Sequence, residues 1–583
     1  MKKIGIGYEN YKDFIDNDLY YVDKTLLIRD ILQKGGKVNL FTRPRRFGKT
    51  LALSMIRTFF ELEYDRDGNI IDKQRYFDGK KILQCDDSIL SKMGRYPVIK
   101  LSLKSAKQSD FKTAIFKLRE EIIYEFARHE YLFNSCILNE DEKNSYKELR
   151  SGEFIWQEKI RQINDPDERE AAFTEEVGKY STALKMLSTL LQKHHGENVI
   201  ILLDEYDVPL ENAYYSGFYD KMVGFIRSLF ESALKTNDAL EFAVVTGCLR
   251  ISKESIFTGL NNLTVNSIRG TDFGEYYGFT PEDTLEMLDH YGLKDNYDVV
   301  KDWYDGYIFG SAEVYNPWSV THYIHEHVNA PDRLAEPYWS NTSSNSIVKD
   351  MIKLSDDTAK EELDRLVNGG TIEKRIHEDI TYDDVHSNQD NLWNFLFFTG
   401  YMRKVSERTE GDDIYMTMCI PNREIRSIFR HQVSLWFEDI VKQTDLNNFH
   451  NAVLNKDTET MENFISDLLE KSISTFDCSE SFYHGFLLSL LYGTPRYTPR
   501  SNRETGNGRA DIVLYPNRPK DPAYIFELKV RKKFNEMDDG LKEAFEQIKE
   551  KKYAEGVLED GYIGSVSYGI CFCKKSCIVG LTE

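Results

Sequence analysis

The chain has 583 residues, of which 41% are hydrophobic and 13% aromatic, and its formal net charge is −21. Single hydrophobic cores stop growing at about 250 to 300 residues, so two or three domains are expected, and the hydrophobic content argues against a disordered chain. The acidic balance opposes indiscriminate binding of nucleic acid, so any such binding has to be local. The longest apolar runs, such as 199–203, are far shorter than the roughly 18 residues that span a bilayer, and no apolar signal core follows the first residues. We therefore expect a cytoplasmic protein without a membrane segment.

A basic loop follows the first predicted strand, 37–41, and precedes a helical pattern at 51–60. Strand, loop and helix in this order are the setting that a phosphate-binding Walker A loop requires. Gly48 lets the backbone approach phosphate, Lys49 is expected to neutralise the β and γ oxygens, and Thr50 to offer its hydroxyl to Mg²⁺. The residues expected to bind ATP here are Arg43, Pro44, Arg45, Arg46, Phe47, Gly48, Lys49 and Thr50.

The start of this loop departs from the standard pattern. Arg43 stands where the Walker A pattern has glycine. Pro44 stiffens the loop, and the charges of Arg45 and Arg46 could serve phosphate, adenine or a partner. Taken alone, the loop is therefore a signal of medium strength.

A second acidic motif supports the nucleotide interpretation. The apolar run 198–203 ends in Asp204 and Glu205, as a central parallel strand does when it delivers a Walker B pair to the edge of a sheet. Asp204 is expected to hold Mg²⁺ through water, and Glu205 to act as the general base on the attacking water. A buried strand that ends at a helix cap is the alternative, and the order of the two motifs makes it the weaker one.

Two further strands flank the Walker B motif in the sequence. Residues 97–103 form a strand candidate between the two Walker motifs, and 240–246 form another after them. Thr246 at the end of the second strand is a candidate sensor of the γ-phosphate. Arg250 is a weaker candidate for the same role. An ordinary surface cation is an equally good interpretation of this residue. This arrangement suits the P-loop ATPases that use a catalytic Glu.

The carboxyl-terminal part carries a different pattern of charges. A helix is predicted at 480–491, followed by strands at 510–514 and 523–530. Because strand side chains alternate, Glu527 and Lys529 share one face. Together with Asp511, Glu527 can hold Mg²⁺ or Mn²⁺, while Lys529 orients a water or stabilises developing charge. His484 is expected to pack or to form a hydrogen bond.

The same region is basic, whereas the chain as a whole is acidic. From 496 to 533 there are ten Lys or Arg residues against four acids. A solvated surface is the simpler interpretation, but the stretch encloses the predicted metal ligands. We therefore expect a local contact with nucleic acid, with DNA preferred over RNA.

Several short motifs are spread along nearly the whole chain: YYVDKT at 20–25, TRPRRFGKT at 42–50, LDEYD at 203–207, TGCLRI at 246–251, WYDGY at 303–307, YNPW at 315–318 and NFLFFTGY at 394–401. Together with Phe279-Thr280 they resemble the bacterial AAA-ATPase-like family that carries a C-terminal PD-(D/E)XK nuclease domain. Arg at position 43 is usual in that family, so the resemblance implies a tolerated variant. It also implies that Glu480 adds a metal ligand, with Glu504 as its alternative, and that Gln547 is the trailing glutamine of such nucleases.

The expected fold class is α/β throughout. A P-loop NTPase domain of the ASCE or AAA-like type, with a parallel sheet, is expected at 1–280, and a restriction-endonuclease-like α/β domain of the PD-(D/E)XK type at 471–583. Thr280, followed by Pro and two acids, predicts the start of a helix. The resemblance suggests a helical or winged-helix lid and linker for 281–470.

Three functions remain open on the sequence. The leading hypothesis is an ATP-hydrolysing protein whose nucleotide state controls a Mg²⁺-dependent nuclease in defence or mobile-element biology. A second is an ATP-dependent switch that binds nucleic acid or a partner and whose nuclease-like domain does not cleave. A metabolic P-loop kinase is the third, and the adjacent acids at 204–205 count against it. A homo-oligomer is also considered, because ATPases of this type often take an Arg from a neighbour, but no Arg here identifies itself as that residue.

Overall fold

The computed structural model describes residues 1–250, 256–257, 260–341, 357–377, 389–432, 444–471, 480–505, 508–518, 520–559 and 561–582. The chain divides into two compact units. The first consists of Met1–Asn341 and Glu373–Ile425, and the second of Thr342–Ile372 and Arg426–Glu583. Much of the predicted middle region thus packs within the first unit, and the domain boundaries at 280 and 470 stay a prediction.

The first unit is built on a parallel sheet of five strands in the order β2-β3-β4-β1-β5. Their bounds are β1 (Val38–Thr42), β2 (Val98–Ser102), β3 (Val199–Asp204), β4 (Leu240–Gly247) and β5 (Leu263–Asn266). Strands β1 and β3 are buried along their whole length, as parallel strands are when helices cover both faces. Because the strands are parallel, the loop after β1 and the acids after β3 lie at the same edge of the sheet.

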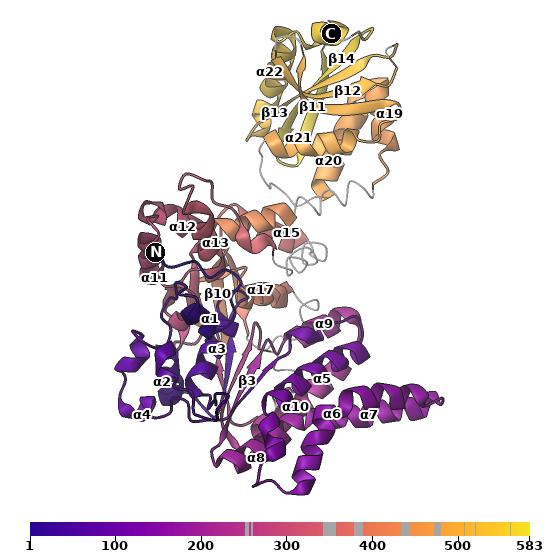
Figure 1. Ribbon diagram of the computed structural model, residues 1–583. Coiled ribbons are helices and arrows are strands. Elements are labelled where there is room, and N and C mark those ends of the chain that lie inside the picture. The colour runs from indigo at the N-terminus through magenta and orange to yellow at the C-terminus, as the bar shows by residue number, and fades with distance from the viewer. Residues whose placement is uncertain are drawn as a thin grey trace. The chain divides into compact units, whose positions relative to one another are not determined.

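Helices cover this sheet on both sides. Figure 1 shows α3 (Lys49–Phe60) on one side of β3, and α5 (Phe111–Arg128) with α10 (Tyr219–Phe230) on the other. It also shows α6 and α7 projecting from the insertion between β2 and β3. The remaining helices of this part are α1 (Tyr11–Asp16), α2 (Leu26–Lys34), α4 (Asp87–Leu90), α6 (Glu140–Gln162), α7 (Pro166–Ser181), α8 (Ala183–His195) and α9 (Val208–Ser216).

The middle region adds helices and two small sheets to the first unit. The predicted N-cap is confirmed, because Thr280 and Asp283 form a capping box at the start of α11. The helices are α11 (Pro281–His290), α12 (Tyr297–Tyr304), α13 (Pro317–His327) and α17 (Gln389–Phe398). Strands β6 (Tyr307–Phe309) and β7 (Ala312–Val314) form a hairpin, and a second sheet has the order β8-β10-β9, with β8 (Ile372–Ile376), β9 (Arg403–Glu410) and β10 (Asp413–Cys419).

The second unit holds a mixed sheet in the order β11-β12-β13-β14-β15, in which only β13 and β14 run parallel. Its strands are β11 (Tyr497–Thr505), β12 (Gly508–Pro516), β13 (Ala523–Val530), β14 (Ser565–Cys573) and β15 (Ser576–Thr582). The helices are α15 (Asp357–Val367), α19 (Asn447–Asn455), α20 (Thr458–Lys471), α21 (Glu480–Leu491), α22 (Met537–Glu550) and α23 (Tyr553–Glu559). The predicted helix at 480–491 and strand at 523–530 are confirmed at both ends.

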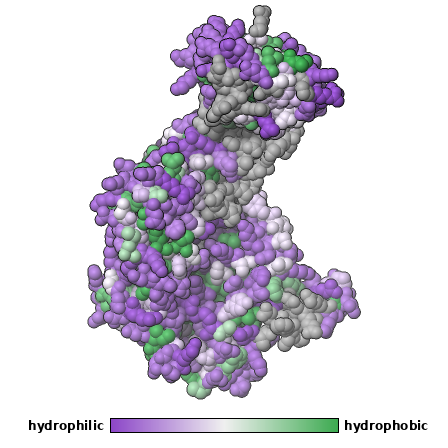
Figure 2. All heavy atoms as spheres, turned by 45° about the horizontal axis from the view of Figure 1, so that its top comes forward, coloured by the Kyte–Doolittle hydropathy of each residue, from purple (hydrophilic) through white to green (hydrophobic). Residues whose placement is uncertain are grey.

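The surface agrees with the composition. Figure 2 shows a face on which hydrophilic residues predominate and hydrophobic residues form small separate groups. Within the ranges that the structure describes, no helix has both the length and the apolar character needed to cross a bilayer.

Candidate nucleotide site and candidate metal site

The loop after β1 folds around the side chain of Lys49. Its Nζ donates hydrogen bonds to the backbone carbonyls of Arg43 at 2.8 Å and Pro44 at 2.9 Å. Gly48 precedes α3 with a φ of 77°, a conformation that glycine adopts without strain. The ammonium is thus held inside the loop at the N-terminus of a helix, where phosphate oxygens bind in P-loop proteins.

The predicted metal and sensor residues meet at Asp204. Its two carboxylate oxygens accept hydrogen bonds from Thr50 Oγ1 at 2.7 Å and from Thr246 Oγ1 at 2.6 Å. Asp204 is 2% exposed, so the carboxylate depends on these partners. Carboxylate and hydroxyl oxygens are hard ligands of the kind that Mg²⁺ prefers, so the residues present fit this ion.

Glu205 lies directly after β3 in an unusual conformation. Its φ is 53°, in the left-handed region that non-glycine residues rarely adopt. Burial and the neighbouring charge of Asp204 raise the pKa of Glu205. A strained backbone and a raised carboxyl pKa are both features found at catalytic bases.

Arg43, the first residue of the predicted nucleotide loop, is held by contacts within the first unit. The Arg43 side chain is fully buried, and its Nη1 donates to the carbonyls of Thr42 at 2.9 Å and Asn266 at 2.6 Å. The guanidinium also lies 5.2 Å from the ring centroid of Tyr277 and 5.4 Å from that of Phe309. The side chain thus faces the protein interior, and a contact between Arg43 and nucleotide stays a prediction. The Arg43 side chain anchors the start of the loop to β5 and to the middle region.

The rest of the loop is also held by side-chain contacts. Arg45 forms an ion pair with Glu211 on α9. Arg46 has a φ of 71° and stacks on Trp318 at 4.0 Å from the ring centroid. Phe47 is buried against aromatic rings of β6. The Arg45 and Arg46 side chains and the backbone of Phe47 stay predicted nucleotide contacts.

Asp207 is a functional candidate that the sequence patterns did not single out. Its Oδ2 accepts hydrogen bonds from the backbone N–H groups of Cys248 at 2.6 Å and Leu249 at 3.1 Å. Tyr206 adds a bond from its hydroxyl to the carbonyl of Leu249 at 2.5 Å. A Cβ at Gly247 would lie 2.5 Å from the Tyr206 ring, so only glycine fits there. These contacts fasten the loop after β4 to the turn that carries Glu205.

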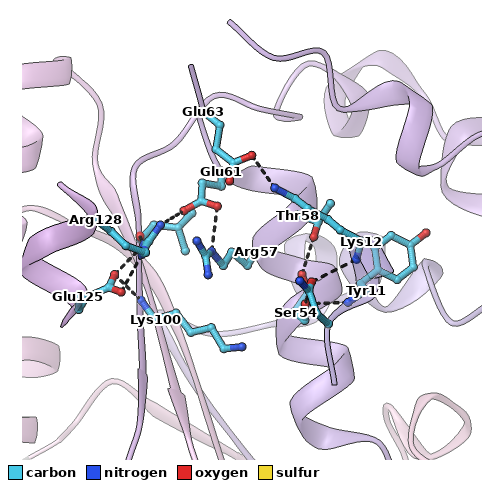
Figure 3. Close-up of polar contacts among 12 residues, drawn as sticks. Tyr11, Lys12, Ser54, Arg57, Thr58, Glu61, Glu63, Lys100, Glu125 and Arg128 are labelled. Atoms are coloured by element: carbon cyan, nitrogen blue, oxygen red, sulfur yellow. Dashed lines mark hydrogen bonds and ion pairs between the residues drawn. The ribbon is translucent and has the colours of Figure 1, made fainter. Parts of the chain in front are cut away.

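A polar network fixes the helix that follows the loop, as Figure 3 shows. At the far end of α3, Glu61 accepts hydrogen bonds from Arg57 Nε at 2.9 Å and from Arg128 Nη1 at 2.7 Å. Arg128 also pairs with Glu125, which accepts a hydrogen bond from the backbone N–H of Lys100 at 2.9 Å. Through these bonds α3 is tied to α5 and to β2.

The predicted metal site lies on two neighbouring strands of the second unit. Asp511 on β12 and Glu527 on β13 come one step beyond the last paired residues of these antiparallel strands. Asp511 Oδ2 accepts a hydrogen bond from the backbone N–H of Leu528 at 2.8 Å, which holds this carboxylate against β13. Lys529 Nζ donates to Glu527 Oε1 at 3.2 Å and to Gln547 Oε1 at 2.7 Å.

The charge of Glu527 is poorly balanced in this arrangement. Glu527 is 1% exposed, and its Oε2 is buried without a hydrogen-bond partner in the described part of the chain. Burial and the charge of Asp511 raise the pKa of Glu527 to about 7, although Lys529 opposes the rise. An unpaired carboxylate oxygen beside a second carboxylate is a donor set that a divalent cation would satisfy, so the residues fit Mg²⁺ or Mn²⁺.

The other predicted site residues are less closely placed. Glu480 is exposed at the start of α21, and its charge also raises the pKa of Glu527. Across the described residues no group of three or more His, Cys, Asp or Glu side chains is arranged to hold a metal ion. The metal role of Glu480 and that of Glu504, whose side chain lies outside the described ones, stay predictions. So does the role of Arg250, which is half-buried three residues after β4.

His484 forms a hydrogen bond to strand β12, which carries Asp511. Its Nε2 donates to the backbone carbonyl of Asp511 at 2.8 Å. The expectation of a hydrogen bond at His484 is confirmed.

Two family models match separate regions of the chain. Residues 5–257 match the family described as predicted AAA-ATPase, and residues 478–581 match the PD-(D/E)XK nuclease superfamily. An uncharacterised protein encoded in the vnfD 5' region of Azotobacter chroococcum mcd 1 is 23% identical over 573 residues, covering 95% of this chain and 93% of the relative. A Walker-type ATPase of Pyrococcus abyssi aligns at 12% identity over 70% of this chain and 94% of its own, with a TM-score of 0.34. The chain therefore joins a region of the predicted AAA-ATPase family to a region of the PD-(D/E)XK nuclease superfamily.

Proposed function

We propose that the first unit binds and hydrolyses ATP and that its nucleotide state controls a Mg²⁺-dependent nuclease in the second unit. The observation that carries the proposal is the meeting of Asp511, Glu527 and Lys529 in a region of the nuclease superfamily, with one oxygen of Glu527 left unpaired. A chain that also holds a Walker A lysine and a Walker B acid has the means to link this site to a nucleotide.

In the nucleotide site, each residue has a distinct proposed task. Lys49 exchanges the two loop carbonyls for oxygens of the β and γ phosphates. Thr50 and Asp204 would hold Mg²⁺, which supplies charge to neutralise the phosphates. Glu205 accepts a proton from the attacking water, and its raised pKa brings it closer to the pH at which a general base works best. Thr246 fixes the orientation of Asp204 through its hydroxyl.

In the nuclease site, Asp511 and Glu527 would hold the metal ion. When bound, that ion makes water a stronger nucleophile and neutralises the scissile phosphate. Lys529 lies beside Glu527, where its ammonium can orient the water or stabilise the charge that develops on phosphate. Gln547 accepts a hydrogen bond from Lys529 and so fixes the position of the ammonium.

Contacts of the phosphate-binding loop suggest how a change of bound nucleotide is transmitted from the ATPase site to the middle region. Arg46 stacks on Trp318, and the ring of Phe47 lies 4.9 Å from that of Tyr307. A Cβ at Gly400 would come within 2.8 Å of Pro44, so the loop packs tightly on this segment as well. We infer that a change in the loop on ATP binding is passed first to these residues of the middle region.

The proposed substrate is nucleic acid, with DNA preferred over RNA. The excess of Lys and Arg in 496–533 supports a local phosphate contact on an otherwise acidic chain. Defence against foreign DNA or mobile-element biology is the proposed setting, and a homo-oligomer that lends an Arg to the ATPase site is part of the proposal.

A binding switch without cleavage is the second candidate function. It is favoured by one observation, which is that the described residues hold no group of three acidic, His or Cys side chains placed for a metal. In that case the second unit binds nucleic acid without cutting it, and ATP changes the affinity of this binding.

Cleavage assays with a variant of the metal site separate the two functions. Purified full-length protein is mixed with single- and double-stranded DNA and RNA, with Mg²⁺, with Mn²⁺ or with a chelator. The proposal expects metal-dependent cleavage that Glu527→Ala abolishes while Glu543→Ala, which changes an exposed carboxylate of α22 that pairs with Arg531, leaves it intact. Cleavage by Glu527→Ala at the wild-type rate would overturn the metal assignment. Nucleic-acid binding without cleavage under all conditions would favour the switch.

A further inference from the structure

The ion pair between Arg45 and Glu211 joins the phosphate-binding loop to α9. Arg45 belongs to the phosphate-binding loop, whereas Glu211 lies in the first turn of α9, directly after the turn that carries Glu205. Their side chains keep 29% and 23% of their surface exposed. The backbone N–H of Glu211 also bonds to the carbonyl of Asp207 at 2.9 Å. One charge contact therefore links the loop to the Walker B turn.

Arg45 and Lys49 both place positive charge near the thiol of Cys248. Lys49 Nζ is 3.7 Å from the sulfur of Cys248, which follows β4. Burial raises the pKa of Cys248 to about 11, and the positive charges of both Lys49 and Arg45 oppose that rise. The two cations thus flank the same thiol at the end of β4, the strand whose Thr246 contacts Asp204.

We propose that Arg45 recognises the terminal phosphate of ATP and that Glu211 holds Arg45 when this phosphate is absent. This inference rests on the proposed ATP binding. A guanidinium presents a planar fork that fits two phosphate oxygens, and a terminal phosphate carries more charge than one carboxylate, so it can displace Glu211. ADP lacks that phosphate and leaves the Arg45–Glu211 pair in place. Arg45 and Glu211 together then set the preference for triphosphate over diphosphate.

The surroundings of Glu211 favour such an exchange. Burial raises the pKa of Glu211, Arg45 opposes the rise, and the charge of Asp207 adds to it. Once Arg45 turns to phosphate, the half-buried Glu211 is left beside the charge of Asp207 and is favoured to take up a proton. Binding of the triphosphate is then accompanied by proton uptake, and binding of ADP is not.

Calorimetric titrations of the full chain test the exchange. The ligands are ADP and the non-hydrolysable β,γ-imido analogue of ATP, each with Mg²⁺. For Arg45→Gln we expect the analogue to bind about tenfold more weakly with ADP little changed, and for Glu211→Gln we expect the analogue to bind about threefold to tenfold more tightly. In the double variant Glu211→Gln should have no effect, because its action passes through Arg45. Glu197→Gln, which removes the exposed Arg95–Glu197 pair of the same unit, is the control.

The outcomes are distinct. If Glu211→Gln leaves the ratio of the two affinities unchanged, or weakens the analogue, the inference is overturned while the proposed ATP binding stands. If the wild type binds neither nucleotide, the proposed function itself fails. If Arg45→Gln does not fold, two measurements still test the inference. One is the affinity of Glu211→Gln for the two nucleotides, and the other is the buffer dependence of the binding heat, which reports proton uptake.

Discussion

Replacing Glu424 by glutamine should stabilise the first unit at alkaline pH and leave it nearly unchanged at acidic pH. Glu424 is fully buried in the middle region. Its carboxyl oxygens accept hydrogen bonds from Ser319 Oγ at 2.8 Å and from the backbone N–H of Trp339 at 2.9 Å. Both donors are neutral, so neither offsets a full negative charge in the way that a cation would.

The pKa of Glu424 gives the size and sign of this effect. Burial raises the pKa from 4.5 to about 8, against the opposing hydrogen bonds from Trp339 and Ser319. The folded state therefore holds a proton that the unfolded state loses, so stability falls as pH rises from about 4.5 to about 8 and is constant above that. At about 1.4 kcal/mol per pKa unit the full effect is about 5 kcal/mol, and structural relaxation around the charge should reduce it to about 2 to 4 kcal/mol. Glutamine has no proton to lose and escapes this penalty.

Urea unfolding at several pH values measures the difference. Tryptophan fluorescence is a suitable probe, because Trp318 and Trp339 lie in the same region. The variant Glu326→Gln, which changes a half-buried carboxylate on α13 that accepts a hydrogen bond from Tyr338, is the matched control and should show no such pH dependence. The reasoning is refuted if Glu424→Gln changes the free energy of unfolding by the same amount at pH 5 and pH 9.

Three further predictions concern the two sites. Lys49→Ala should weaken ATP binding by about tenfold or more, measured by calorimetry, because the loop loses the ammonium group that two of its carbonyls hold in place. Unchanged affinity would argue against a phosphate-binding loop. Asp207→Ala should destabilise the first unit by about 1 to 3 kcal/mol and slow ATP hydrolysis, since the buried N–H of Leu249 and the partly buried N–H of Cys248 lose their acceptor, while Asp207→Asn keeps an acceptor and most of both properties. Mg²⁺ affinity of the second unit should rise with pH through about 7, where Glu527 ionises, and Glu527→Gln should remove that dependence; a flat profile in the wild type would contradict it.

Local sequence patterns predicted the elements that carry the sites. Alternation placed Glu527 and Lys529 on one face of β13, and the structure joins their side chains at 3.2 Å. The apolar run before Asp204 became a fully buried parallel strand, and the residues of both Walker motifs meet through the Thr50–Asp204 hydrogen bond. In each case the chemistry depends on neighbours in the sequence or on the shared edge of a parallel sheet.

Features that depend on distant segments could not be predicted in this way. Arg43 was visible only as a departure from the Walker A pattern, and the sequence did not reveal that Tyr277 and Phe309, more than 230 residues away, enclose its guanidinium. The raised pKa of Glu424 likewise arises from burial by the middle region. Asp207 could have been found, since an acid three residues after the Walker B Asp is visible in LDEYD, but its two backbone partners lie about 40 residues away.

The central claim is that nucleotide in the first unit controls cleavage by the second. Its most direct test is the rate of nucleic-acid cleavage by the full chain in Mg²⁺, measured without nucleotide, with ADP, with ATP and with the imido analogue, for the wild type and for Lys49→Ala. We expect the wild-type rate to differ between ADP and the analogue, and Lys49→Ala to cleave at one rate in all four conditions. Equal wild-type rates in all conditions, or the same nucleotide response in Lys49→Ala, would contradict it.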